Sequence, residues 1–199
     1  MSAEKTIILP VYTYDQDILR QKAQPVTEMT DDTHQFIRTM HATMHGADGI
    51  GLAANQVGDA RAVAVVDLSD FDGEDKHPPL TLINPVITAY SDEKNSSEEG
   101  CLSLPKYRDM VERPIAIQVR FFDETMREHH REIGGFLARV LQHEIDHLNG
   151  IYFFDHLSAL RKAMAFQKLK RISLDQVPTT YPLHPNTPRG AVRAGMKKK

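Results

Sequence analysis

The chain contains 199 residues with a formal net charge of −3 at pH 7, and 41% of its residues are hydrophobic. This length predicts one globular domain with a buried core, and the charge excludes a protein that binds nucleic acid through an overall basic field. No stretch approaches the roughly 20 apolar residues that span a bilayer, and the apolar run 7–9 is too short for a signal peptide. We therefore expect a soluble, unexported protein with no membrane contact.

The chain has ten histidines and a single cysteine, Cys101. One cysteine excludes an intramolecular disulfide framework, so the composition suits a reducing compartment and predicts a cytoplasmic protein. A lone thiol is usually a small buried hydrophobe, but beside many imidazoles it is also a candidate metal ligand.

The first predicted helix begins at Thr30-Asp31-Asp32, residue types that cap helices, and ends at Gly46. Three later segments are rich in Val and Ile, as strands are: 62–67, 80–87 and 115–122. Two polar segments between them are predicted to be loops: 70–79 and 91–99.

Two further helices are predicted, over 133–148 and 158–172. Strands followed by helices, with hairpin-length connections between the strands, indicate an α+β fold. We expect antiparallel or mixed β-sheets packed around the helix 133–148, with one helix on its N-terminal side and one on its C-terminal side. We assign 1–172 to this domain.

The C-terminal segment 173–199 differs from the body in composition. It has four prolines, five basic residues and one acidic residue, so it carries +4 and the rest of the chain −7. Such a segment buries too little apolar surface to offset its ordering entropy, which predicts an extended or disordered tail. A basic tail can contact an acidic partner such as ribosomal RNA, although a solvated tail with no specific role is the more common case.

The strongest chemical motif is His143-Glu144-Ile145-Asp146-His147. Histidines four residues apart on a helix project from one face, so both imidazoles can bind one metal ion, while Glu144 is placed to handle a proton of bound water. The non-metal interpretation is a pair of buried, hydrogen-bonded histidines. A catalytic site also needs a third ligand, for which Cys101 is the natural candidate.

A glycine-rich segment, 49–58, contains Gln56, whose neutral amide could hold an oxyanion in a dry pocket. The segment lacks the G-x-G-x-x-G spacing of a dinucleotide site and is not followed by the Lys-Ser/Thr of a phosphate loop. By itself it is weak evidence for any function.

Together, GIGLAANQVG (49–58), EGCLSLP (99–105) and QHEIDHLNG (142–150) resemble the three signature motifs of bacterial peptide deformylase, in the same order. The resemblance extends over about 11–169 and leaves the tail unexplained. It implies a hydrolase that removes the formyl group from the initiator methionine of nascent polypeptides as they leave the ribosome, releasing formate.

The resemblance also implies roles for individual residues. Cys101, His143 and His147 would bind one divalent metal ion, with Fe²⁺ expected in the cell and Zn²⁺, Ni²⁺ or Co²⁺ able to substitute. Five residues would belong to the peptide-binding cleft: Ile50, Gly51, Glu99, Gly100 and Arg108.

The implied chemistry agrees with the residue types. The metal lowers the pKa of its bound water, and the resulting hydroxide attacks the formyl carbon. Glu144 acts as general base and then as general acid toward the departing amine. The Gln56 amide and the backbone N–H of Leu102 stabilise the oxyanion.

Two alternatives remain open at this stage. A zinc endopeptidase can use the same helix, with a downstream third ligand for which His156 is the nearest option. A non-catalytic ribosome-associated or metal-binding module would be expected to have lost Glu144, Gln56 or a ligand, and this sequence has lost none. The basic residues of 158–172 and of the tail also suggest ribosome contact; no sequence-specific nucleic-acid binding is expected.

Overall fold

The computed structural model describes residues 7–70 and 77–186. It contains three α-helices: α1 (Asp31–Gly46), α2 (Gly135–Leu148) and α3 (Ala159–Ser173). Three short 3₁₀ helices accompany them: η1 (Asp17–Arg20), η2 (Ala54–Val57) and η3 (Phe153–His156). The strands are β1 (Gly51–Ala53), β2 (Val63–Val66), β3 (Leu80–Tyr90), β4 (Lys94–Cys101), β5 (Leu104–Pro114), β6 (Ala116–Phe122) and β7 (Glu128–Gly134).

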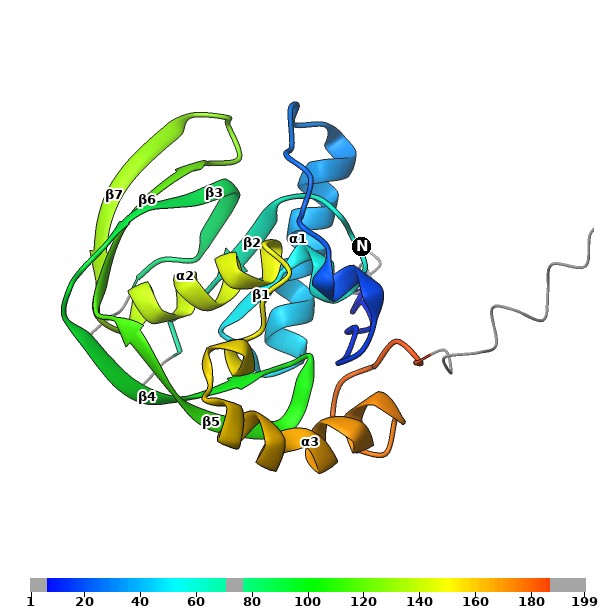
Figure 1. Ribbon diagram of the computed structural model, residues 1–199. Helices are drawn as coiled ribbons and strands as arrows, with labels where there is room; N and C mark the ends of the chain where they lie inside the picture. Colours follow the sequence, from blue (N-terminus) through cyan, green and yellow to red (C-terminus); the bar gives the residue numbers. More distant parts are fainter. Residues whose placement is uncertain (1–6, 71–76, 187–199) are drawn as a thin grey trace, which may run out of the picture.

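The strands form two antiparallel sheets, one with five strands in the order β1-β2-β3-β6-β7 and one with the two strands β4 and β5. Helix α2 runs through the middle of the molecule, with the strands arranged around it and α3 at the periphery (Figure 1). The predicted α+β class, with sheets around a central helix and a helix on either side of it in the sequence, is confirmed.

Strand β2 is buried along its whole length, which explains its uninterrupted apolar sequence. Val63 and Val65 pack into the cluster that contains the apolar face of α1, whereas Val66 packs into the cluster that contains α2. Because side chains alternate across a strand, a sheet covered on both faces needs apolar residues at every position. The same packing fixes α2 against the sheet that supports the site.

The helix predictions are confirmed to within a few residues. The hydroxyl of Thr30 accepts a hydrogen bond from the backbone N–H of Thr33, at 3.2 Å, and so caps α1. This satisfies one of the N–H groups that the first turn of a helix leaves without an internal partner. Helix α1 ends at Gly46, as expected.

The prediction that 91–99 is a loop is wrong, because Lys94–Cys101 forms β4 and pairs with β5 from Lys94↔Pro114 onward. The segment is polar because much of β4 is exposed, and its strand conformation comes from pairing with β5 rather than from intrinsic propensity. This strand carries Cys101 into the site. Of the predicted loop 70–79, residues 71–76 lie outside the described part of the chain.

The division into 1–172 and a tail stays a prediction. Helix α3 ends at Ser173, and the described residues beyond it, 174–186, contain no helix or strand but lie against the body through hydrogen bonds to residues 11–16. Residues 187–199 lie outside the described part. Among the described residues, no helix has the length and apolar character needed to cross a bilayer.

Candidate metal centre and active site

Helix α2 presents His143 and His147 from one face, one turn apart. Their rings lie 4.9 Å apart between centroids, and both side chains are buried. The helix is held in place by its other side chains, such as Leu137 and Leu141, which pack into the cluster shared with the five-stranded sheet. The imidazoles therefore lie on a fixed support that points them away from that sheet contact.

Cys101, the last residue of β4, brings the third donor atom. Its Sγ lies 3.1 Å from Nε2 of His147, and the donor atoms of Cys101, His143 and His147 all lie within 4.8 Å of one another. Two imidazoles and one thiolate suit Zn²⁺, Fe²⁺, Co²⁺ or Ni²⁺. The described residues thus contain a donor set that fits one divalent metal ion.

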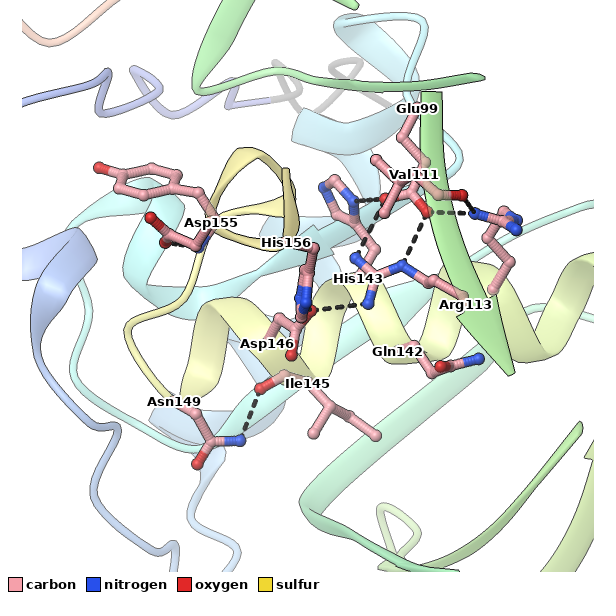
Figure 2. A network of polar contacts seen from close by, with 12 residues as sticks. Glu99, Val111, Arg113, Gln142, His143, Ile145, Asp146, Asn149, Asp155 and His156 are labelled. Carbon is pink, nitrogen blue, oxygen red and sulfur yellow. Dashed lines mark hydrogen bonds and ion pairs between the residues drawn. The ribbon is translucent and has the colours of Figure 1, made fainter. Parts of the chain in front are cut away.

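Glu99 orients His143 from the side opposite Cys101. Its Oε2 lies 3.0 Å from Nδ1 of His143, which leaves Nε2 of that ring free to bind metal. The same carboxylate accepts hydrogen bonds from Arg113 at 2.7 and 3.0 Å (Figure 2). Arg139 donates a further hydrogen bond to it at 2.6 Å. Burial by itself would raise the pKa of Glu99, but the hydrogen bonds from His143 and Arg113 lower it to about 2.

The polar network continues from Arg113 toward the surface. Nη1 of Arg113 donates to Oδ2 of Asp146 at 2.7 Å, and Nε2 of His156 lies 2.7 Å from the same oxygen (Figure 2). Asp146 therefore belongs to the polar scaffold of the site. His156 pairs with Asp146 and is not part of the cluster of metal donors.

Glu144 lies beside the metal donors and is almost fully buried. Burial raises the pKa of its carboxyl to about 7, so it can both accept and release a proton near neutral pH. Its Oε2 has no hydrogen-bond partner among the described residues. A Cβ atom at Gly51 would collide with the Glu144 carboxylate, so the glycine makes room for this side chain.

Gln56, on η2, has its amide fixed in one orientation. Its Oε1 accepts a hydrogen bond from the N–H of Ala53 at 2.8 Å, so Nε2 points the other way, toward Sγ of Cys101 at 3.4 Å and Oγ of Ser103 at 3.2 Å. A donor held in place before the reaction is what oxyanion stabilisation requires. Gln56 is buried, so water does not compete with it.

These groups border a cleft of about 590 Å³. Two of the metal donors, Cys101 and His143, line this cleft. So does every residue to which the resemblance gave a role in catalysis or in peptide binding: Ile50, Gly51, Gln56, Glu99, Gly100, Leu102, Arg108 and Glu144. Glu99 differs from the other lining residues in that its carboxylate is already hydrogen-bonded to His143, Arg113 and Arg139. Arg108 lies at the exposed rim, 3.7 Å from Glu98.

Sequence reasoning missed the two arginines that bind Glu99, namely Arg113 and Arg139. It also missed Tyr181, which lines the cleft. Both arginines are buried, and nothing in their local sequence distinguishes them from exposed arginines. Tyr181 belongs to a Pro-rich segment that composition marks as a tail. Only the three-dimensional contacts reveal these residues.

The family model for polypeptide deformylase matches residues 8–163 of this chain. The peptide deformylase of Salinibacter ruber is 43% identical over 184 residues, covering 89% of this chain and 94% of the relative. That of Brucella suis biovar 1 is 43% identical over 173 residues, covering 87% of this chain and 95% of the relative.

Solved structures agree with the sequence relatives. The peptide deformylase of Ehrlichia chaffeensis has a TM-score of 0.76 at 35% identity, covering 83% of this chain and 96% of that chain. The enzyme of Synechococcus elongatus, solved in complex with actinonin, has a TM-score of 0.76 at 38% identity, covering 90% of this chain and 95% of that chain.

The donor set predicts the metal content of single variants. Cys101→Ser, His143→Ala and His147→Ala should each lose the bound ion after dialysis, because each removes one of three protein ligands. His156→Ala and the parent protein should each keep one equivalent of bound metal per chain. Elemental analysis of the dialysed proteins gives the stoichiometry. Full metal content in His147→Ala, or its loss only in His156→Ala, would contradict this assignment.

Proposed function

This chain belongs to the polypeptide deformylase family, and we propose that it removes the formyl group from the N-terminal methionine of nascent polypeptides and releases formate. The observation that carries the proposal is the convergence of Cys101, His143 and His147 beside a buried Glu144 in one cleft. The reaction is an amide hydrolysis: the C–N bond of the formamide breaks, and a bond forms between the formyl carbon and a water oxygen.

Cys101, His143 and His147 are the residues that would hold the metal ion. A divalent ion there supplies a Lewis acid that polarises a carbonyl and lowers the pKa of water. Glu99 holds the His143 ring through Nδ1 and so leaves its Nε2 facing the other two donors. The protein's contribution is a rigid donor set in a buried cleft.

Negative charge that develops on the formyl oxygen is stabilised by the Gln56 amide and the backbone N–H of Leu102. Gln56 supports this role because its Oε1 is held by Ala53, which keeps Nε2 on the cleft side. Removing one such donor in other hydrolases costs about 10²–10³ in turnover. Leu102 lines the same cleft, next to Cys101.

Glu144 moves the proton. As general base it takes a proton from the attacking water, and as general acid it gives that proton to the departing amine. A carboxyl whose pKa is raised to about 7 is suited to both steps. Gly51 supports the role by leaving space for the carboxylate, and it lines the cleft together with Ile50 and Gly100.

The peptide chain of the substrate would lie along the cleft walls formed by Ile50, Gly51, Gly100 and, at the rim, Arg108. Glu99 belongs to the same wall, and its carboxylate serves the substrate indirectly through His143. A 590 Å³ cleft has the size of small-molecule and peptide side-chain sites, which supports a short N-terminal segment as the substrate.

An endopeptidase using the same helix is not favoured. It would bind metal through a third ligand downstream of His147, and the nearest option, His156, is paired with Asp146. The donor atom of Cys101 lies within 4.8 Å of those of His143 and His147, which supports Cys101 as the third ligand. A formylated peptide and its unblocked form separate the two activities, because a protease cleaves an internal bond in both.

We further propose that the ion in the cell is Fe²⁺ and that the protein works in the cytoplasm, where nascent chains emerge. The thiolate ligand supports a soft or borderline ion, and Cys101 is a free thiol. A ferrous site with a thiolate ligand is sensitive to oxygen. Metal analysis after anaerobic purification tests this, and a different native metal would overturn the assignment of iron.

Contact with the ribosome through α3 and the tail is also proposed. Helix α3 buries Ala165, Leu169 and Ile172 and exposes Lys168, Lys170 and Arg171 together with Met164 and Phe166. Exposed basic residues on one helix are the kind of surface that binds RNA phosphates. The buried face means that deleting α3 would disturb the core, so charge reversal is the cleaner test.

The mechanism predicts the behaviour of Glu144→Gln. Formate release from formyl-Met peptides should fall by about 10² or more, because the proton-transfer group is lost while the volume is kept. The variant should retain one equivalent of metal. Glu132→Gln, exposed on β7, is the matched control and should keep parental activity. Turnover at the parental rate in Glu144→Gln would contradict the proposed role of Glu144 in proton transfer.

Ribosome contact predicts that the double variant Lys170→Glu/Arg171→Glu binds ribosomes more weakly and with a smaller dependence on salt. Co-sedimentation at several salt concentrations measures both. Lys22→Glu, also exposed but on a distant part of the sequence, should behave as the parent protein does. Equal co-sedimentation of all three proteins would refute the contact.

A further inference from the structure

The segment that follows α3 returns to the cleft. Residues 174–186 leave the end of α3 and run alongside the N-terminal part of the described chain (Figure 1). The N–H of Val11 donates to the carbonyl of Pro182 at 2.9 Å, and the N–H of His184 donates to the carbonyl of Val11 at 2.8 Å. These two bonds pair Val11 with Leu183 like a short parallel bridge.

Side chains strengthen this attachment. The rings of Tyr12 and His184 stack with centroids 4.0 Å apart. Nδ2 of Asn186 donates to Oγ1 of Thr13 at 2.9 Å and to Oδ1 of Asp175 at 2.7 Å, which ties the far end of the segment back to its beginning. The segment is therefore anchored at both ends of the stretch that carries Tyr181.

The N-terminal residues that receive this segment are themselves attached to the catalytic groups. The N–H of Tyr12 donates to the carbonyl of Gln56 at 2.7 Å, and the N–H of Tyr14 donates to the carbonyl of Ser103 at 3.0 Å. The anchoring of the segment thus extends directly to η2, which carries Gln56, and to the turn that follows Cys101.

Tyr181 makes the direct contact with the cleft. Its hydroxyl donates a hydrogen bond to the carbonyl oxygen of Leu102 at 2.8 Å, and the half-buried side chain lines the cleft beside Leu102 and Lys106. Leu102 and Ser103 form the two-residue turn between β4 and β5, which the Cys101↔Leu104 pair closes while neither turn residue is itself paired in the ladder. The carbonyl of Leu102 therefore has no ladder partner, and the Tyr181 hydroxyl is the group that binds it.

We propose that Tyr181 is a positioning residue that orients the Leu102 backbone for the reaction. Its hydroxyl holds the Leu102 carbonyl, which restricts rotation of the residue whose N–H faces the oxyanion, and its ring closes that side of the cleft. This inference rests on the proposed function, because it assigns Tyr181 to the oxyanion step of deformylation. Donors that are fixed before the reaction stabilise the transition state without a reorganisation cost.

Tyr181→Phe tests the hydroxyl while keeping the ring. With a formyl-Met peptide, kcat should fall by about three- to tenfold, the range expected for losing one neutral hydrogen bond. KM should stay within about twofold, because the wall of the cleft remains. Tyr90→Phe, an exposed tyrosine on β3, is the matched control and should keep both constants. An unchanged kcat in Tyr181→Phe overturns the proposal.

Tyr181→Ala tests the ring. It should lower kcat as Tyr181→Phe does and, in addition, raise KM several-fold, because the wall is removed. Asn186→Ala loosens the anchor, and its effect on kcat should largely vanish in the Tyr181→Phe background, since both act on the same contact. Fully additive effects of the two substitutions would contradict a shared positioning role.

A second readout does not depend on activity. Amide hydrogen exchange in the segment 101–107 should be faster in Tyr181→Phe than in the parent and in Tyr90→Phe, because the turn loses a restraint. Identical exchange in all three proteins would contradict the proposal. If the parent protein releases no formate, the proposed function fails; if it does and only the Tyr181 results are negative, this inference alone fails.

Discussion

The buried carboxylate of Glu99 is the interaction on which the site depends. It lies on β4, two residues before Cys101, and binds His143 and Arg139 of α2 and Arg113 of β5. One carboxylate thereby joins the strand that carries the thiolate to the helix that carries both imidazoles. Removing one partner from such a buried ionic group typically costs about 3–5 kcal/mol, because the remaining charges lose their counterion.

This arrangement explains how the two-stranded sheet can hold Cys101 in place as a metal ligand. Strand β4 is polar and much of it is exposed, so it buries little apolar surface that could hold it against the rest of the molecule. Arg139 compensates by also donating to the carbonyls of Val111 and Asn95, at 3.0 and 2.9 Å, and so binds both strands of the hairpin to α2. These charged contacts, together with the pairing of β4 with β5, hold the thiol of Cys101 beside the imidazoles.

Local sequence patterns predicted the parts of the site that one element determines. The helical spacing of His143 and His147 placed both rings on one face, and the chemistry of a lone thiol beside them identified Cys101. The same reasoning made 91–99 a loop, because polar residues have low strand propensity and the pairing with β5 is a tertiary effect. It also left Tyr181 in a featureless tail, since hydrogen bonds to Val11 and Leu102 link positions far apart in the sequence.

The Glu99 contact makes a direct claim about metal binding. Glu99→Gln keeps the shape of the side chain but removes its charge, so the metal dissociation constant of the folded variant should rise by about 10- to 100-fold, the usual effect of losing a partner of a metal-bound histidine. Glu98→Gln, the exposed neighbour, should bind metal as the parent does. An unchanged dissociation constant for Glu99→Gln would show that the donors assemble without this carboxylate and would contradict the account.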